Sequence, residues 1–285
     1  MLIVSDNKYR SKYMTLKARI RQAVNAIKPN ISDKPDIAII CGSGLGSLVD
    51  GVDVSYKVPY AGVPNVNPSG APGHAGVFVF GTIGARQVVC MQGRLHAYEG
   101  NSPEDVVMPL YVAYALGART LIVTNASGGI NGSYEPGDAM LIKDHINLMG
   151  SSPLTLCDDN DMIHGYPDMT HTYSKRLRKL ALDRAKDNDL TLHEGIYIGV
   201  RGPQFETPAE IRAYAALGAD AVGMSTVYES IVAHALGMDI LGISLISNKA
   251  AGLSEEPLSE SDITKVTKGA AHKISGLVNN VVGAL

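Results

Sequence analysis

The sequence predicts an α/β fold, because helical stretches alternate along the chain with apolar runs of strand length. Three helical stretches end in the same way, with a glycine that leads toward an apolar run, at residues 116–118, 217–219 and 236–238. A glycine directly after the last helical residue supplies the left-handed cap that closes a helix. The 285 residues suffice for one large α/β domain or two small ones, and no Pro/Ser-rich linker divides them.

The individual elements follow from local patterns. An amphipathic stretch predicts the first helix, and β-branched or apolar runs bounded by Gly and polar residues predict strands. Thr207 with Glu210, and Thr226 with Glu229, have the spacing of capping boxes, and Ser259 is a candidate N-cap. We therefore expect helices at residues 9–27, from 103, at 174–186, from 208, from 227 and from about 259, and strands at residues 36–41, 77–80, 88–91, 120–124, 196–200 and 240–246.

Composition argues against several classes of protein. The net charge of −3 provides no broad basic surface for nucleic acid, so any bound anion needs a local site. Cys41, Cys90 and Cys157 have neither metal-site nor disulfide spacing, which favours a reducing cytosol. The N-terminal apolar run is too short for a signal peptide, and no run reaches the roughly 18 residues of a membrane span. We expect a cytoplasmic protein that binds neither nucleic acid nor membranes.

The segment after the predicted strand at residues 88–91 combines a fixed cation, a titratable ring and an aromatic hydroxyl. If the extended backbone continues, Arg94, His96 and Tyr98 point to the same face, because side chains alternate along a strand. Open α/β sheets build their binding crevices at strand ends. The alternative is a strand that runs into a polar surface loop.

A glycine-rich turn at residues 42–46 follows the strand at residues 36–41. Glycines let backbone N–H groups approach an anion, and Ser43 adds a hydroxyl, so the turn is a candidate phosphate cradle. It lacks the third glycine of a dinucleotide fingerprint, because Ser47 stands there, and it lacks the lysine of a P-loop. The turn is therefore either an anion site of another kind or only a tight turn.

Three further segments carry polar groups at element ends. Phe205 and Glu206 lie just before the helix that starts at Pro208, and an aromatic face beside a carboxylate suits a flat heterocycle. Ser225 precedes a helix N-terminus, whose free N–H groups favour an anion, although it could serve only as capping polarity. Asn248 and Lys249 end the strand at residues 240–246 and are either functional or a solvated turn.

Together, the polar groups at the strand ends imply one shared crevice, formed by Ser43, Arg94, Asn125, Glu206 and Asn248. In this order they resemble the trimeric purine nucleoside phosphorylase family. The motifs at residues 72–76, 124–129 and 144–147 extend the resemblance over nearly the whole chain. It implies a single α/β domain over residues 1–285, with a mixed, distorted β-barrel-like sheet flanked by helices.

The resemblance also implies an enzyme of purine salvage, a pentosyltransferase that cleaves inosine- and guanosine-type (deoxy)nucleosides with inorganic phosphate. No cofactor and no metal are expected, since phosphate is a co-substrate, and a homotrimer is expected. The implied catalytic residues are Asn248, Glu206 and His96. The implied ligands are Ser43, His74, Arg94, His96, Ala126 and Ser225 for phosphate, Phe205, Glu206, Val222, Gly223, Asn248 and Lys249 for the base, and Tyr98, Met224, Tyr166 and Glu260 for ribose.

Three positions depart from the family pattern or leave a choice. Glu260 stands where many members have a histidine that contacts the 5′-hydroxyl, and it either accepts that hydrogen bond or merely favours the first helical turn. Tyr228 replaces a usual proline. Tyr166 occupies the position of an aromatic residue that reaches a neighbouring subunit, or it packs in its own loop. A nucleoside- or phosphate-binding protein without turnover is the competing class.

Overall fold

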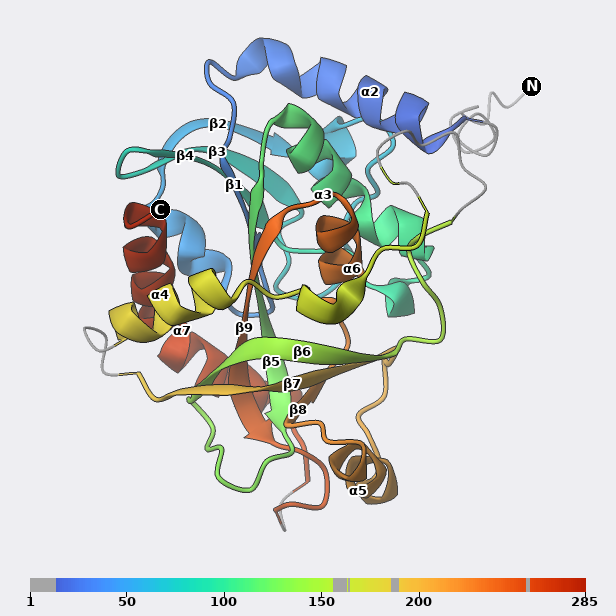
Figure 1. Ribbon diagram of the computed structural model, residues 1–285, viewed down its shortest axis with the longest axis vertical. Coiled ribbons are helices and arrows are strands. Elements are labelled where there is room, and N and C mark those ends of the chain that lie inside the picture. Colours follow the sequence, from blue (N-terminus) through green and yellow to red (C-terminus); the bar gives the residue numbers. More distant parts are fainter. Residues whose placement is uncertain (1–13, 156–162, 164, 186–189, 255–256) are drawn as a thin grey trace.

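The computed structural model describes residues 14–155, 163, 165–185, 190–254 and 257–285. Within this part of the chain, nine strands form one mixed sheet with helices packed around it (Figure 1). The strands are β1 (Ile37–Cys41), β2 (Asp53–Pro59), β3 (Val77–Ile83), β4 (Arg86–Gln92), β5 (Thr120–Gly129), β6 (Ala139–Leu148), β7 (Leu192–Val200), β8 (Ala221–Gly223) and β9 (Asp239–Lys249).

Part of the sheet closes on itself, because β9 pairs with two strands. The order is β2-β3-β4-β1-β5-β8-β7-β6-β9, and β9 also pairs in parallel with β5. Strands β5, β8, β7, β6 and β9 therefore form a closed ring, and β2, β3, β4 and β1 extend from β5 as an open wing. This arrangement confirms the mixed, barrel-like sheet that the family resemblance implied.

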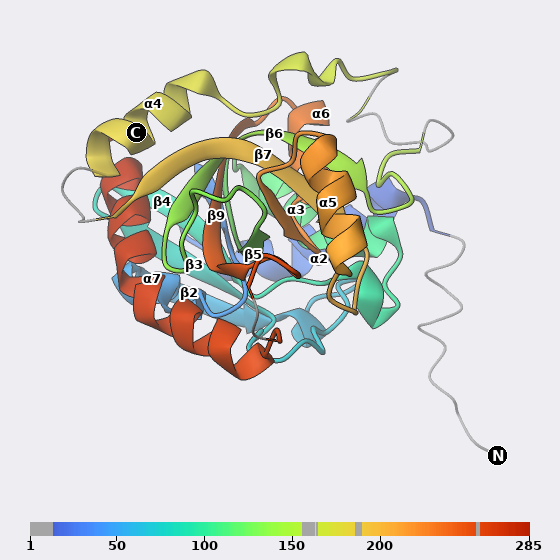
Figure 2. The same ribbon diagram turned by 90° about the horizontal axis from the view of Figure 1, so that it is seen from below.

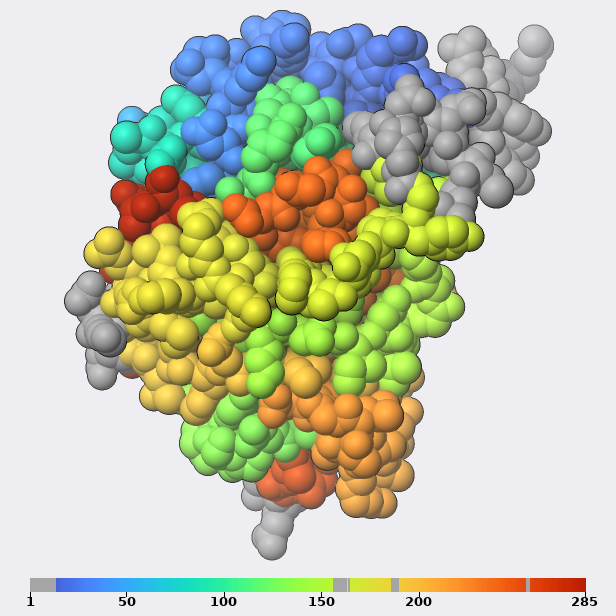
Figure 3. All heavy atoms as spheres, viewed as in Figure 1, coloured from blue at the N-terminus to red at the C-terminus, as the bar shows by residue number. Residues whose placement is uncertain are grey.

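The helices bury their apolar faces on both sides of the sheet. Helices α2, α3 and α6 share one hydrophobic cluster with the sheet, and α4 and α7 share another. Seen from below, α5 and α7 lie on opposite sides of β5 and β9, and in the space-filling view α2 and α5 lie toward opposite ends (Figures 2 and 3). The helices are α2 (Leu16–Ile27), α3 (Pro103–Leu116), α4 (Lys175–Ala185), α5 (Pro208–Ala216), α6 (Val227–Ala235) and α7 (Glu260–Gly283), and short 3₁₀ turns lie at Lys28–Asn30, Gly46–Gly51, Tyr60–Gly62, Ala97–Glu99 and Met169–His171.

Every expected element is present, with shifted ends. Residues 9–13 and Lys186 lie outside the described residues, so the predicted start of the first helix and the predicted end of α4 stay predictions. Cys157 also lies outside the described residues. Strands β2, β6 and β8 were not expected. The largely exposed β2 carries little apolar signal, and β8 has only three residues, so neither shows the apolar run that identifies a buried strand. None of the described helices is both long and apolar enough to cross a membrane.

Candidate active site

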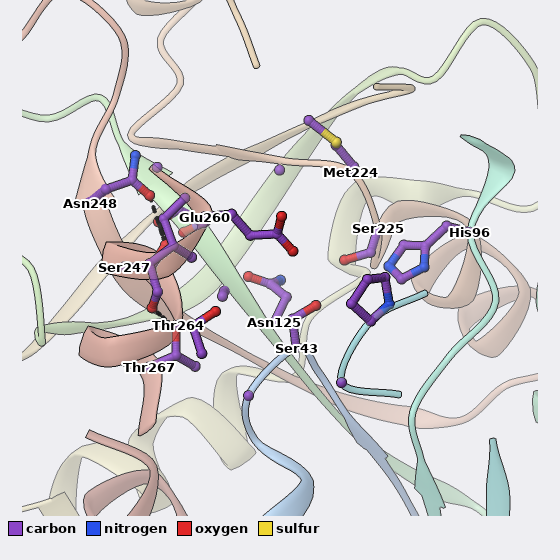
Figure 4. A pocket seen from close by; sticks show the side chains of 18 of the residues that line it. Ser43, His96, Asn125, Met224, Ser225, Ser247, Asn248, Glu260, Thr264 and Thr267 are labelled. Atoms are coloured by element: carbon purple, nitrogen blue, oxygen red, sulfur yellow. Dashed lines mark hydrogen bonds between the residues drawn. The ribbon is translucent and has the colours of Figure 1, made fainter. Parts of the chain in front are cut away.

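One pocket of about 780 Å³ gathers the strand ends that the sequence singled out (Figure 4). Ser43, Arg94, Asn125, Glu206 and Asn248 all line it, which confirms the expected crevice. Ser43, Arg94, Asn125 and Asn248 lie on or just after β1, β4, β5 and β9, which run parallel and end at the same edge. Glu206 joins them from the segment after β7. Among the described residues, no three His, Cys, Asp or Glu side chains gather as metal ligands.

The glycine-rich turn lies directly against β5. A side chain at position 42 would place its Cβ 2.6 Å from the carbonyl oxygen of Thr124, so only glycine fits there. The N–H of Gly42 instead donates to the Thr124 hydroxyl at 3.0 Å, and Gly44 has a φ of +72°. The turn thereby carries Ser43 to the wall of the pocket, as a cradle for a small anion requires.

Arg94 and His96 reach the pocket by a route that differs from the predicted one. Strand β4 ends at Gln92, and Gly93 has a φ of +101°, so the expected alternation to Tyr98 is wrong. The three side chains nevertheless line the same pocket, because a 3₁₀ turn begins after His96 and carries Tyr98 to it. Position 93 also requires glycine, because a Cβ there would lie 2.8 Å from the Cβ of His74.

The guanidinium of Arg94 is fixed in place beneath the pocket. It is only 4% exposed and donates to the Thr226 hydroxyl at 3.0 Å and to the carbonyl of Thr124. Glu229, equally buried, lies 3.5 Å from Nη1 and neutralises part of its charge. Nε is buried and has no hydrogen-bond partner among the described residues, so one donor of Arg94 is unsatisfied.

His96 is held by Glu99 and by the ring of Tyr98. Nδ1 of His96 lies 3.0 Å from a carboxylate oxygen of Glu99, and the two rings of His96 and Tyr98 stack at 4.6 Å. Burial alone would raise the pKa of Glu99, but hydrogen bonds from His96 and from the backbone N–H of Gly70 outweigh it and lower that pKa. Glu99 is therefore a carboxylate that accepts from Nδ1, which leaves Nε2 of His96 as the nitrogen available to a ligand.

His74 lies behind Ser43 rather than on the pocket wall. Its Nδ1 accepts the backbone N–H of Arg94 at 2.8 Å, and its Nε2 lies 2.9 Å from the Ser43 hydroxyl. Burial, together with the neighbouring His96 and Arg94, lowers the pKa of His74 to about 3, so the ring is neutral at ordinary pH. With Nδ1 as acceptor, Nε2 carries the proton and donates to Ser43, whose own O–H is then free for an anion.

The segment before α6 corrects a second expectation. Thr226 and Glu229 do not form a capping box, because the Thr226 side chain makes no capping hydrogen bond and Glu229 pairs with Arg94. The predicted anion position survives, since Ser225 lines the pocket beside Ser43 and His96 (Figure 4). At α5, in contrast, the capping box of Thr207 and Glu210 is present on both sides, as predicted.

The end of the pocket away from Ser225 and His96 has fewer polar side chains (Figure 4). Val222, which lies near Asn248 against Gly128, lines it together with Phe205, Glu206 and Gly223. Burial raises the pKa of Glu206 above its ordinary value. At position 223 only glycine fits, because a Cβ would lie 2.4 Å from the hydroxyl of Tyr197. This end therefore offers an aromatic face, a backbone floor and a titratable carboxylate.

Asn248 lies at this end of the pocket, where the pairing between β9 and β5 comes to its end. Its Oδ1 accepts from the Ser247 hydroxyl at 2.8 Å, and its Nδ2 donates to the carbonyl of Lys249 at 2.8 Å. An amide nitrogen has two N–H groups, so one remains for a ligand. Figure 4 shows Asn248 and Glu260 on the same side of the cavity.

Besides His74, two more predicted site residues are not among those that line the pocket. Lys249 forms an ion pair with Glu135 at 2.6 Å. Tyr166 is 89% exposed, so it does not pack in its own loop. Ala126, Tyr98 and Glu260 all line the pocket, at positions consistent with their predicted roles.

Sequence reasoning missed the contribution of α7. Ile263, Thr264, Thr267, Lys268 and Ala271 also line the pocket, together with Glu260 at the start of the helix. Their spacing of three and four residues places them on one helical face. A polar stripe at that spacing was visible in the sequence, but nothing in it indicated which face of the helix meets the cavity.

Comparisons with known proteins show which family the chain belongs to. The family model described as "Phosphorylase superfamily" matches residues 36–283. The purine nucleoside phosphorylase 1 of Geobacillus stearothermophilus is 49% identical over 88% of this chain and 92% of its own length.

Solved structures agree as well. Crystal structures of a Schistosoma purine nucleoside phosphorylase with hypoxanthine and with adenosine match with TM-scores of 0.88 and 0.87, each at 35% identity. Each match covers 93% of this chain and 96% of the other. The chain belongs to the phosphorylase superfamily and, within it, to the purine nucleoside phosphorylase family.

Proposed function

We propose that this chain cleaves inosine- and guanosine-type nucleosides, in ribo and deoxy forms, with inorganic phosphate. The products are the free purine and (deoxy)ribose 1-phosphate. The observation that carries the proposal is one pocket with a cationic, hydroxyl-rich end and a carboxylate–amide end. An anion and a purine held at these two ends would have the sugar between them, beside Tyr98, Met224 and Glu260.

Phosphate is assigned to the end formed by Ser43, Arg94, His96, Ser225 and the backbone N–H of Ala126. Arg94 supplies a permanent charge on a side chain that is itself almost fully shielded from water, where such a charge acts more strongly than on the surface. The Ser43 hydroxyl, which accepts from His74, is oriented to donate. The phosphate is both the bound anion and the nucleophile, so the reaction needs no nucleophilic side chain and no cofactor.

In the reaction, a phosphate oxygen attacks C1′ of the sugar while the bond from C1′ to the purine nitrogen breaks. The bonding electrons leave with the purine, which then takes up a proton. The sugar acquires oxocarbenium character, as in glycoside hydrolysis, and the adjacent phosphate charge stabilises it. Asn248 is assigned to donate its free N–H to purine N7, so that this hydrogen bond strengthens as the base becomes anionic.

Glu206 is assigned to base selection. An ionised carboxylate accepts the N1–H of a 6-oxopurine, whereas adenine presents an acceptor there, and a buried mismatch of two acceptors is costly. A Schistosoma purine nucleoside phosphorylase was crystallised with hypoxanthine, a 6-oxopurine, and one from Schistosoma mansoni was crystallised with adenosine. The discrimination proposed for this chain therefore concerns turnover and is measured as kcat/KM rather than as occupancy.

The finer features of the proposal are a homotrimer and a cytoplasmic location. The exposed ring of Tyr166 supports the first, because a large aromatic side chain on the surface is typical of an interface. In a trimer, Tyr166 would complete the sugar site of a neighbouring copy. The odd, sparse cysteines support a reducing compartment.

The test follows hypoxanthine release from inosine, by chromatography, with and without inorganic phosphate. The proposal expects release only with phosphate, in step with ribose 1-phosphate, and far slower cleavage of adenosine. A chain that binds inosine but releases no base under either condition is the binding protein that the sequence left open. Adenosine turnover equal to that of inosine would refute the role given to Glu206.

A further inference from the structure

Thr226 has a backbone conformation that threonine rarely adopts. Its φ of +73° and ψ of −40°, with the N–H of Val227 donating to the carbonyl of Ser225 at 2.8 Å, define a γ-turn with positive φ. Such turns are strained, and a β-branched residue adds to the strain. Strain of this kind persists only where the surroundings fix it, and it concentrates at functional sites. The contacts of the Thr226 side chain show what holds the turn.

The Thr226 hydroxyl is the meeting point of three side chains. Arg94 Nη1 lies 3.0 Å from it, Asn125 Nδ2 lies 2.8 Å from it, and the Ser225 hydroxyl lies 3.1 Å from it. Thr226 itself is fully buried and does not line the pocket, whereas Arg94, Asn125 and Ser225 all do. The three pocket residues are thus connected from behind by one oxygen atom.

The number of hydrogens and lone pairs fixes the direction of each bond. A hydroxyl has one hydrogen to donate and two lone pairs to accept. Arg94 can only donate, and Asn125 donates through its amide nitrogen because its Oδ1 accepts from the Ser244 hydroxyl at 2.6 Å. Both lone pairs of Thr226 are then filled, so its single hydrogen goes to the oxygen of Ser225.

The consequence falls on the pocket. Since Ser225 accepts from Thr226, its own hydrogen is not used on Thr226. The Tyr197 hydroxyl also faces the Ser225 side chain, so that hydrogen points either to Tyr197 or to a ligand. A serine that presents O–H favours an anion, whereas one that presents only lone pairs would repel it. The same logic applies to Ser43, whose oxygen accepts from His74 on the opposite side of the pocket.

We propose that Thr226 is a positioning residue for phosphate: its hydroxyl orients Ser225 as a donor and aligns Arg94 and Asn125. This inference rests on the proposed function, because it assigns the cationic end of the pocket to phosphate. The strained turn places the Thr226 oxygen within reach of all three partners, which a relaxed first helical residue would not do. Loss of the hydroxyl frees the Ser225 hydrogen from its imposed direction and leaves two buried donors unpaired.

The experiment compares Thr226→Val, which keeps the shape and removes the hydroxyl, with Thr226→Ser, which keeps the hydroxyl and removes a methyl group. With Thr226→Val, the KM for phosphate is expected to rise on the order of 10-fold or more, as for a lost charge-assisted hydrogen bond. The KM for inosine should change far less. Thr226→Ser should keep a phosphate KM within about 2-fold of the parental value, a margin comparable to the additivity error of independent substitutions.

A double-mutant cycle with Ser225→Ala tests the route. If Thr226 acts partly through Ser225, Thr226→Val costs less phosphate affinity in the Ser225→Ala background than in the parental chain. A purely structural role would instead lower the melting temperature and raise both KM values together. Thr226→Ala takes the place of Thr226→Val if the latter does not fold.

The results separate this inference from the proposed function. A parental chain with no phosphate-dependent release of hypoxanthine would refute the function and the inference with it. An active parental chain whose phosphate KM is unchanged by Thr226→Val would overturn the inference alone. The inference also fails if folded Thr226→Ser loses phosphate affinity as strongly as Thr226→Val, because the hydroxyl would then not be the cause.

Discussion

Replacing Arg94 tests the site and the fold together, because the structure couples this residue to a buried carboxylate. Glu229 lies 3.5 Å from Nη1, both side chains are 4% exposed, and neither oxygen of Glu229 has a hydrogen-bond partner among the described residues. Arg94→Ala would therefore leave an uncompensated buried charge. Breaking a buried pair in this way costs about 3–5 kcal/mol of folding free energy. This cost follows from the buried position of Glu229 beside Arg94, which only the structure reveals.

The same substitution should also remove most phosphate use. A donor that faces developing charge in a dry site contributes about 3–4 kcal/mol, or roughly 10²–10³-fold in kcat/KM for phosphate. The two effects can be separated with the double variant Arg94→Ala/Glu229→Gln, which removes the orphaned charge but not the phosphate defect. We expect the double variant to recover part of the lost stability and none of the phosphate use.

The assays are urea unfolding for stability and steady-state kinetics over a range of phosphate concentrations. Arg176→Ala is the matched control, because Arg176 is exposed and pairs only with the equally exposed Asp239 at 2.9 Å. It should change neither the unfolding midpoint nor the phosphate KM appreciably. An Arg94→Ala protein with parental stability and parental dependence on phosphate would refute both the ion pair and the phosphate assignment.

Four further substitutions, at three positions, test the base and the subunit contact. Asn248→Ala should lower kcat for inosine on the order of 10²-fold, as for loss of an oxyanion donor. Asn248→Asp should shift relative kcat/KM toward 6-aminopurines. If both variants kept the parental kcat, Asn248 would be only a solvated residue at the strand end. Because burial raises the pKa of Glu206, protonation should remove the acceptor for N1–H and reduce inosine kcat/KM as pH falls through that pKa. In Glu206→Gln, whose amide does not titrate, this acid limb should vanish from the pH profile, and its persistence would assign it to another group. Tyr166→Ala should raise the KM for inosine more than that for phosphate, while an active monomer by light scattering at assay concentration would contradict a shared site.

Much of the site was predictable, because strand ends are marked locally. Apolar runs followed by glycine or polar residues identified Ser43, Arg94 and Asn248, and parallel strands bring such ends to one edge. Arg94 and His96 line the pocket as predicted, but the predicted extended backbone that was to bring them there is wrong. A period-two pattern carries no information about the positive φ of Gly93, which ends the strand and redirects the chain.

Two other errors share one physical cause, which is long-range competition for polar groups. Glu229 has the local spacing of a capping residue, but Arg94, 135 positions earlier, takes it as an ion-pair partner. Lys249 was expected at the base, yet Glu135 from the segment after β5 binds it. Such pairings depend on the fold, because a capping-box pattern covers only four consecutive residues, whereas the competing partner lies more than a hundred positions away in the sequence.

The central claim is that the two ends of the pocket bring phosphate and a purine nucleoside into reaction. The most direct measurement supplies the purified chain with inosine and follows hypoxanthine, first without phosphate and then with it. The account predicts release that begins on addition of phosphate, with one ribose 1-phosphate formed for each hypoxanthine. Release at the same rate without phosphate, or no release with it, would contradict the account.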